Sequence, residues 1–107
     1  MGTAKWLMVV DLDLQPEIEE EWNRWYDEIH LPEIVECPGF ERATRYIAPD
    51  SDPDGRRRHL TIYELAGPEA MESEILAERR GLGPFADQAR SRVRVYEQHL
   101  VLEADDV

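Results

Sequence analysis

The sequence is poor in cysteine and contains no long apolar run. Cys37 is the single cysteine among 107 residues, which excludes an intrachain disulfide framework and a multi-thiolate metal site. It has no obvious basic partner, so a nucleophilic role is not expected. The longest apolar runs, such as residues 6–10, are far shorter than the roughly 18 residues of a membrane-spanning helix. With no secretory signal pattern either, we expect a cytoplasmic protein without a membrane partner.

Basic charge is also scarce. The chain has 12 Lys and Arg residues against 24 Asp and Glu, a formal net charge of -12. An acidic excess of this size repels phosphate backbones and anionic membranes, and the one basic run, residues 56–58, is flanked by aspartates. We therefore expect no nucleic-acid partner. The 42% hydrophobic and 34% charged fractions are those of a folded chain, and the length fits a single domain, residues 1–107.

The hydropathy pattern predicts four strands, over residues 6–14, 40–47, 59–65 and 92–103. A helix is predicted between the first two strands, and a weaker one over residues 67–80. Residues 85–90 would add at most a short helical turn, and an acidic end, residues 104–107, is expected to fray. This β-α-β-β-α-β order is the α+β, ferredoxin-like plan, a four-stranded antiparallel sheet with both helices on one face. The bare apolar face would then pair with a second copy.

The first helix is predicted from its apolar stripe. It opens at Pro16 with an acidic first turn, and one face then carries Ile18, Trp22, Trp25 and Ile29. Pro32 disfavours helical geometry before it, so the helix is expected to end or kink near His30, with a further turn over residues 33–35.

Four segments carry a family resemblance: WNRWYDEIH at residues 22–30, LPEIVECPGF at 31–40, RATRY at 42–46 and HLTIYEL at 59–65. Together they resemble the dimeric α+β barrel superfamily, especially its small bacterial branch related to EthD-like proteins. The resemblance implies a homodimer that pairs sheet against sheet and a pocket within the barrel or between each sheet and its helices. It implies many activities, among them cofactor-free monooxygenases, polyketide cyclases, lactone isomerases and dehydratases. Haem-binding branches exist, but no persuasive haem-ligand signature occurs here, so no cofactor is expected.

His30 is the first candidate for chemistry, because it alone matches by position the proton-handling histidine that the resemblance implies. Histidine titrates near neutral pH and can both take and give a proton. Asp27 and Glu33 lie three residues to either side, and the helix end favours positive charge, so we predict a raised pKa for His30. The alternative is a structural role, capping helix carbonyls or binding a carboxylate across the connection.

Further candidates lie on the same helix and on the strands. Tyr26, one turn before His30, would either bind a substrate oxygen or widen the apolar stripe. Trp22 and Trp25 would either be core residues or stack on an aromatic substrate. Strand alternation leaves the faces open, because a shift of one residue swaps every assignment; the more polar set on each strand could line the barrel. The strand candidates are Tyr63, Tyr96, His59 and His99. Arg42 and Arg45 fall on opposite faces of their strand, so at most one of these two arginines would reach a pocket and stabilise an enolate or carboxylate.

A metal site is not expected. Asp27, His30 and Glu33 have helical spacing and Asp11 and Asp13 add a carboxylate pair, but Pro32 disturbs the geometry and no second histidine clusters with them.

The family resemblance, together with these candidate residues, implies a cofactor-independent cyclase, isomerase or lyase acting on a small aromatic or polyketide-like molecule, in which a proton leaves the carbon next to a carbonyl. Two alternatives remain: a cofactor-free monooxygenase acting on an electron-rich phenol, and a non-catalytic accessory protein that holds a small molecule. The predicted catalytic residues are His30, Tyr26 and Tyr63, and the predicted substrate-binding residues are Trp22, Trp25, Tyr96, Arg45 and His59.

Overall fold

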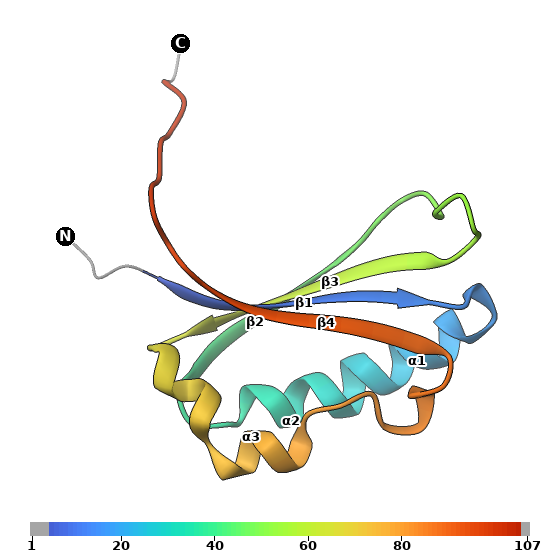
Figure 1. Ribbon diagram of the computed structural model, residues 1–107, viewed down its shortest axis with the longest axis horizontal. Coiled ribbons are helices and arrows are strands. Elements are labelled where there is room, and N and C mark those ends of the chain that lie inside the picture. Colours follow the sequence, from blue (N-terminus) through green and yellow to red (C-terminus); the bar gives the residue numbers. More distant parts are fainter. Residues whose placement is uncertain (1–4, 106–107) are drawn as a thin grey trace.

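In the computed structural model, which describes residues 5–105, one antiparallel sheet carries all the helices on one of its faces (Figure 1). The strands are β1 (Trp6–Leu14), β2 (Phe40–Ile47), β3 (Arg57–Leu65) and β4 (Ala89–Glu97). They lie in the order β2-β3-β1-β4 with every neighbouring pair antiparallel. This arrangement confirms the predicted ferredoxin-like α+β fold. Over these residues, no helix has both the length and the apolar character needed to cross a membrane.

Helical segments fill the two long connections. The first connection holds the 3₁₀ turn η1 (Pro16–Ile18), α1 (Glu19–Trp25), the π-helical turn η2 (Tyr26–His30) and α2 (Leu31–Val35). The second holds the 3₁₀ helix η3 (Pro68–Glu72), α3 (Glu74–Arg79) and the 3₁₀ turn η4 (Gly83–Phe85). The single helix predicted over residues 67–80 is thus divided at Ser73, whose hydroxyl accepts a 3.1 Å hydrogen bond from the Leu76 N–H and caps α3.

Of the two outcomes predicted for the first helix near His30, an end or a kink, the structure shows an irregular turn without an end, and the further turn over residues 33–35 lies in α2. The helix does not stop near His30: the Leu31 N–H donates to the Tyr26 carbonyl five residues earlier, and α2 continues through Pro32. This wider turn inserts one extra residue into the helix and shifts its buried face by one position. His30 is therefore buried, and Ile29, predicted on the apolar stripe, is 51% exposed.

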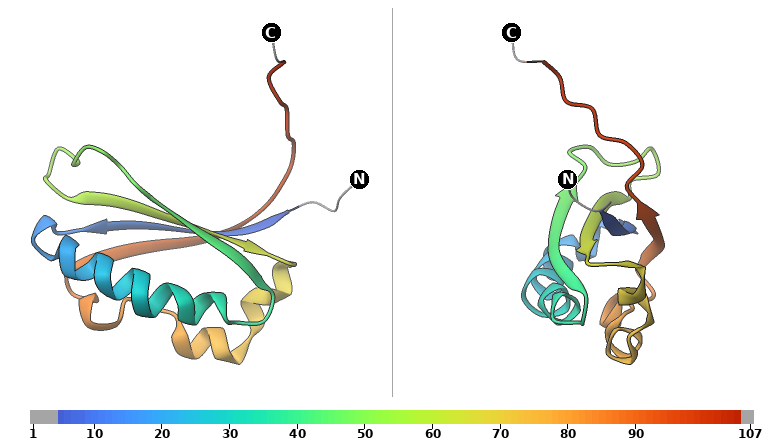
Figure 2. Two further views of the ribbon diagram at one scale, coloured as in Figure 1. Left: turned by 180° about the vertical axis from the view of Figure 1, so that it is seen from behind. Right: turned by 90° about the vertical axis from the view of Figure 1, so that its left-hand side faces the viewer.

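The core lies between the sheet and the helices. Strand alternation turns Met8, Val10, Leu12 and Leu14 of β1 toward the helix layer, and all four are buried. The opposite face of the sheet has no helix over it in either view of Figure 2. Its central positions are apolar and half-buried or exposed: Leu7, Val9, Leu60, Ile62, Tyr46 and Tyr96.

The last strand differs from its predicted range of residues 92–103. β4 starts at Ala89 and ends at Glu97, which pairs with the first residue of β1. The helical turn predicted over residues 85–90 is replaced by η4, which shares only Phe85 with that range. Beyond Glu97 the Gln98 N–H still donates to the Lys5 carbonyl, but β1 offers no further partner. Residues 98–105 then run away from the sheet (Figure 1), and Leu102 is 84% exposed. Asp106 and Val107, part of the predicted frayed end, lie outside the described residues.

Substitution of Gly39 tests the packing at the start of β2. Gly39 has φ +86°, and a Cβ there would lie 2.7 Å from the Ala70 Cβ. Gly39→Ala should lower the free energy of unfolding by about 2–4 kcal/mol, because left-handed strain and overpacking add. Gly55→Ala is the matched control: it has φ +85° with no atom within 4 Å, so only strain of about 1–2 kcal/mol applies. Urea unfolding measures both, and equal losses would contradict the prediction.

Candidate functional site

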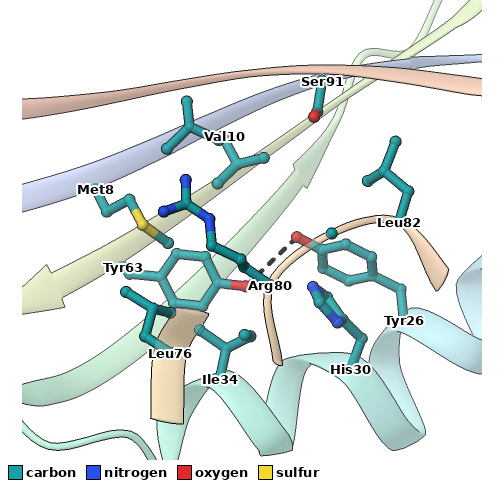
Figure 3. A pocket seen from close by; sticks show the side chains of 12 residues that line it. Met8, Val10, Tyr26, His30, Ile34, Tyr63, Leu76, Arg80, Leu82 and Ser91 are labelled. Atoms are coloured by element: carbon teal, nitrogen blue, oxygen red, sulfur yellow. Dashed lines mark hydrogen bonds between the residues drawn. The ribbon is translucent and has the colours of Figure 1, made fainter. Parts of the chain in front are cut away.

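A cavity of about 160 Å³ opens between the helix layer and the sheet (Figure 3). Side chains reach it from β1, β3 and β4, from the π turn and α2, and from α3 and the loop that follows it. Its walls are mainly apolar, and its polar groups are two tyrosine hydroxyls, an imidazole, a serine hydroxyl and a guanidinium. The lining residues are Met8, Val10, Tyr26, His30, Ile34, Tyr63, Leu76, Arg80, Gly81, Leu82, Ser91 and Val93.

His30 enters the cavity because of the π turn, and its environment makes it a neutral base. The residue is only 8% exposed, and burial lowers the pKa of its imidazole, against a smaller opposing effect of Glu33. The predicted raised pKa is therefore wrong, since desolvation outweighs the nearby carboxylates. The ring stacks on Trp25 at a centroid distance of 4.8 Å and an interplanar angle of 18°. At neutral pH the imidazole is uncharged and can accept a proton.

Three hydroxyl groups lie in a row beside His30. Tyr26 Oη is 2.9 Å from Thr61 Oγ1 and 3.4 Å from Tyr63 Oη, and Figure 3 marks the second of these contacts. Burial raises the pKa of both phenols, so both keep their protons at neutral pH. Two mutual hydrogen bonds use two of the three hydroxyl protons. When Thr61 donates to Tyr26 and Tyr26 donates to Tyr63, the hydroxyl proton of Tyr63 is free to bind an oxygen in the cavity.

Arg45 lies behind Tyr26 and does not line the cavity. Its guanidinium carbon is 5.0 Å from the centroid of the Tyr26 ring, a cation–π distance. Its Nη1 donates to Asp27 Oδ1 at 2.5 Å and its Nη2 to Asn23 Oδ1 at 2.9 Å. Arg45 therefore ties β2 to the first helix and supports the Tyr26 ring from the far side.

His59 belongs to the same buried network. Its Nδ1 lies 2.6 Å from Arg45 Nη2, which can only donate, so Nδ1 accepts and the proton is on Nε2. That Nε2 donates to Glu19 Oε2 at 2.7 Å. Burial, with Arg45 and Arg57 beside it, lowers the pKa of His59 although Glu19 opposes this. His59 is thus a neutral bridge between strand and helix and does not line the cavity.

The remaining predicted residues fall in three places. Trp22 is fully buried in the core, where its ring contacts Trp25, Tyr26 and Phe85, and Trp25 forms the support under His30. Tyr96 lies on the outer face of the sheet, away from the cavity. The other side chains considered also lie elsewhere: Arg42 pairs with Glu64 on the outer face, and His99 is exposed after β4.

On β3 the more polar set, His59, Thr61 and Tyr63, which was considered for the barrel lining, faces the helices instead. On β4 the opposite holds, because the cavity receives Ser91 and Val93 while Arg94 and Tyr96 point outward. Ser91, Leu82 and Arg80 also line the cavity and were not among the predicted site residues. Arg80 was predicted at the end of the weak helix, Leu82 in the glycine-rich break after it, and Ser91 just before the fourth strand, so the local pattern assigned none of them to a face.

Within residues 5–105, all of the carboxylates considered for a metal except that of Glu33 pair with arginines, Asp11 with Arg58 among them. Asp27 pairs with Arg45, and Asp13 pairs with Arg56 and Arg90. Within residues 5–105 no three His, Cys, Asp or Glu side chains gather in a group that could hold a metal ion.

Comparison with known proteins finds likeness in structure only. No family model matches the sequence, and no curated protein matches it. An EthD family protein from Bacillus halodurans is 14% identical over 88% of this chain and 99% of its own, with a TM-score of 0.62. A dimeric ferredoxin-like protein from an uncultured marine organism is 13% identical over 94% and 99%, with a TM-score of 0.60.

A third solved structure is a monooxygenase, the product of ActVA-Orf6 of Streptomyces coelicolor, in complex with nanaomycin D. It is 16% identical over 94% of both chains, with a TM-score of 0.52. These likenesses agree with the strand order, the antiparallel sheet and the single helix layer. The chain therefore shares the ferredoxin-like α+β fold of these solved structures.

Proposed function

We propose that the protein is a cofactor-independent enzyme in which His30 removes a proton from the carbon next to a carbonyl of a small aromatic or polyketide-like substrate. The observation that carries the proposal is the neutral, buried imidazole in an apolar cavity beside two protonated phenols. A buried base of lowered pKa and a pre-positioned hydroxyl donor are the two groups that enolate formation requires.

The steps follow from the positions of these groups. A substrate carbonyl oxygen accepts the hydrogen bond of Tyr63, which the row of hydroxyls through Tyr26 supports. The adjacent C–H faces His30, whose imidazole takes the proton while the electron pair moves into the enolate. The imidazolium then returns the proton to another atom, or to a leaving group, which gives isomerisation, cyclisation or elimination. Trp25 holds the imidazole plane in place during the transfer.

A monooxygenase is the second candidate, and the likeness to the Streptomyces monooxygenase favours it. The first step is the same removal of a proton by His30. The carbanion then reduces molecular oxygen: one oxygen atom enters the product as a carbonyl, and the other leaves as water with the two hydrogens of the reacting CH₂. A small, mainly apolar cavity with few polar groups suits both the proton-transfer reaction and the monooxygenation.

Replacement of His30 tests the shared first step. With 2-tetralone in D₂O under argon, NMR should show protein-catalysed deuterium exchange next to the carbonyl, and His30→Gln should slow it by about 10²–10⁴-fold. His99→Gln makes the same change at an exposed position and should leave the rate unchanged. Unchanged exchange in His30→Gln would exclude His30 as the base. An absence of exchange in the wild type would contradict the proposed proton removal and favour a non-catalytic protein that holds a small molecule. Oxygen uptake in air would select the monooxygenase.

The pH dependence of the exchange follows from the burial of His30. The base is the neutral imidazole, which predominates above its pKa, and burial holds that pKa below the ordinary 6.5. The rate should therefore exceed half of its plateau value at pH 6.5 and fall as the pH is lowered further. Rate measurements from pH 4.5 to 8, with an NMR titration of the imidazole, give the midpoint. A midpoint above 6.5 would contradict the assigned environment.

We also propose that two copies associate through the outer face of the sheet. That face presents Leu7, Val9, Leu60 and Ile62 at its centre with no helix above them (Figure 2). A contiguous apolar face of this kind is unusual on a monomer, and one structural neighbour is named as dimeric.

A charged residue at the centre of this face should therefore prevent association. Ile62 lies between Val9 and Thr44 in the sheet, so Ile62→Glu would bury a carboxylate between two sheets. Analytical ultracentrifugation should give about twice 12.5 kDa for the wild type and 12.5 kDa for Ile62→Glu. Ile29→Glu, on the exposed side of the helix layer, is the control and should remain a dimer. A monomeric wild type would refute the proposed interface.

A further inference from the structure

Arg80 contributes a positive charge to the edge of the cavity. It follows α3 directly, where its N–H donates a 2.9 Å hydrogen bond to the Leu76 carbonyl and its backbone turns to an extended conformation. The residue is exposed, yet it lines the same cavity as Tyr63 and His30, and Figure 3 shows its side chain among theirs. The cavity therefore has an apolar interior and one cation at its opening.

The charge of Arg80 is not matched by an acidic side chain. Nine of the twelve Lys and Arg residues lie within 4.0 Å of a carboxylate in residues 5–105. The neighbouring Arg79 is one of them, since it binds Glu36 and the Glu33 carbonyl. Arg80 forms no such pair within these residues, although the protein has twice as many acidic as basic side chains. Arg92 and Arg94 share this property but lie on the outer face of β4.

The loop after Arg80 is fixed to the site. Gly81 and Gly83 have φ of +117° and +52°, and a Cβ on Gly83 would lie 2.6 Å from Trp25 Cζ2. The loop thus packs directly against the indole that stacks on His30. Because Trp25 contacts both Gly83 and the His30 ring, the loop that follows Arg80 is held in a defined position relative to His30.

We propose that the ligand of this cavity is an organic carboxylate, with its carboxylate on Arg80 and its apolar body between the sheet and α3. This inference rests on the proposed function, because it assigns a substrate class to the same site. Met8, Val10 and Leu76 provide the apolar walls, and a guanidinium binds a carboxylate through two parallel hydrogen bonds. An anion approaching a protein of net charge -12 needs a local cation to offset the repulsion.

Binding of two matched probes, 2-naphthoate and its neutral amide 2-naphthamide, tests this assignment by isothermal titration calorimetry. The wild type should bind the naphthoate about 10-fold more tightly than the amide, with the difference shrinking as salt rises. In Arg80→Gln the affinities for the naphthoate and the naphthamide should lie within about 2-fold of each other. Arg80→Lys should retain part of the preference for the naphthoate. Arg24→Gln removes the same charge from an exposed site outside the cavity and should change neither affinity.

Equal affinity of the wild type for both probes, no binding of the naphthoate, or an unchanged preference in Arg80→Gln would overturn the proposal. The outcome is separable from that of the proposed function, because binding needs no turnover and 2-tetralone carries no charge. Catalysed exchange without a preference for the naphthoate refutes only the carboxylate. A preference that depends on Arg80, in a protein without exchange activity, refutes only the proton transfer by His30.

Discussion

The π-helical turn over residues 26–30 is the constraint on which the site depends. One extra residue in the helix turns the buried face from Ile29 to His30 and brings Ile34 onto the cavity wall. Tyr26, which opens the turn, lies against the sheet, where its ring packs on Arg45 and its hydroxyl contacts Thr61 and Tyr63. A regular helix would direct an isoleucine inward at this point, and the cavity would have no base. The backbone irregularity and the chemistry therefore have a single origin.

Burial decides the charge state of each group in and behind the site. The protein as a whole is strongly acidic, which would favour protonated histidines, yet both His30 and His59 have lowered pKa values. Desolvation is the larger effect because both rings lie between the sheet and the first helix. The two differ in their partners: His59 is held by Arg45 and Glu19 and only connects elements, whereas His30 faces the cavity.

The fold was predictable from the sequence because it depends on periodic patterns that local residues carry. The ranges of β1 and β2 and the order of all elements follow from alternation and from the apolar stripe of the first helix. Three features were not predictable. The π turn depends on i→i+5 bonding that tertiary packing selects, the end of β4 depends on where β1 begins, and the pKa of His30 depends on burial by residues distant in sequence. For the same reason, the strand candidates could be grouped by shared face, but neither the face that meets the cavity nor Arg80 could be identified.

The row of hydroxyls through Thr61, Tyr26 and Tyr63 has a consequence for the kinds of ligand the cavity can hold. Each hydroxyl is both a donor and an acceptor, so the row has two proton orders that share one set of heavy-atom positions. In one order Tyr63 offers a proton, which suits a ketone; in the reverse order it offers a lone pair, which suits the hydroxyl of the corresponding enol. A switch between them moves protons alone. One rigid cavity can in this way hold both tautomers of the same molecule.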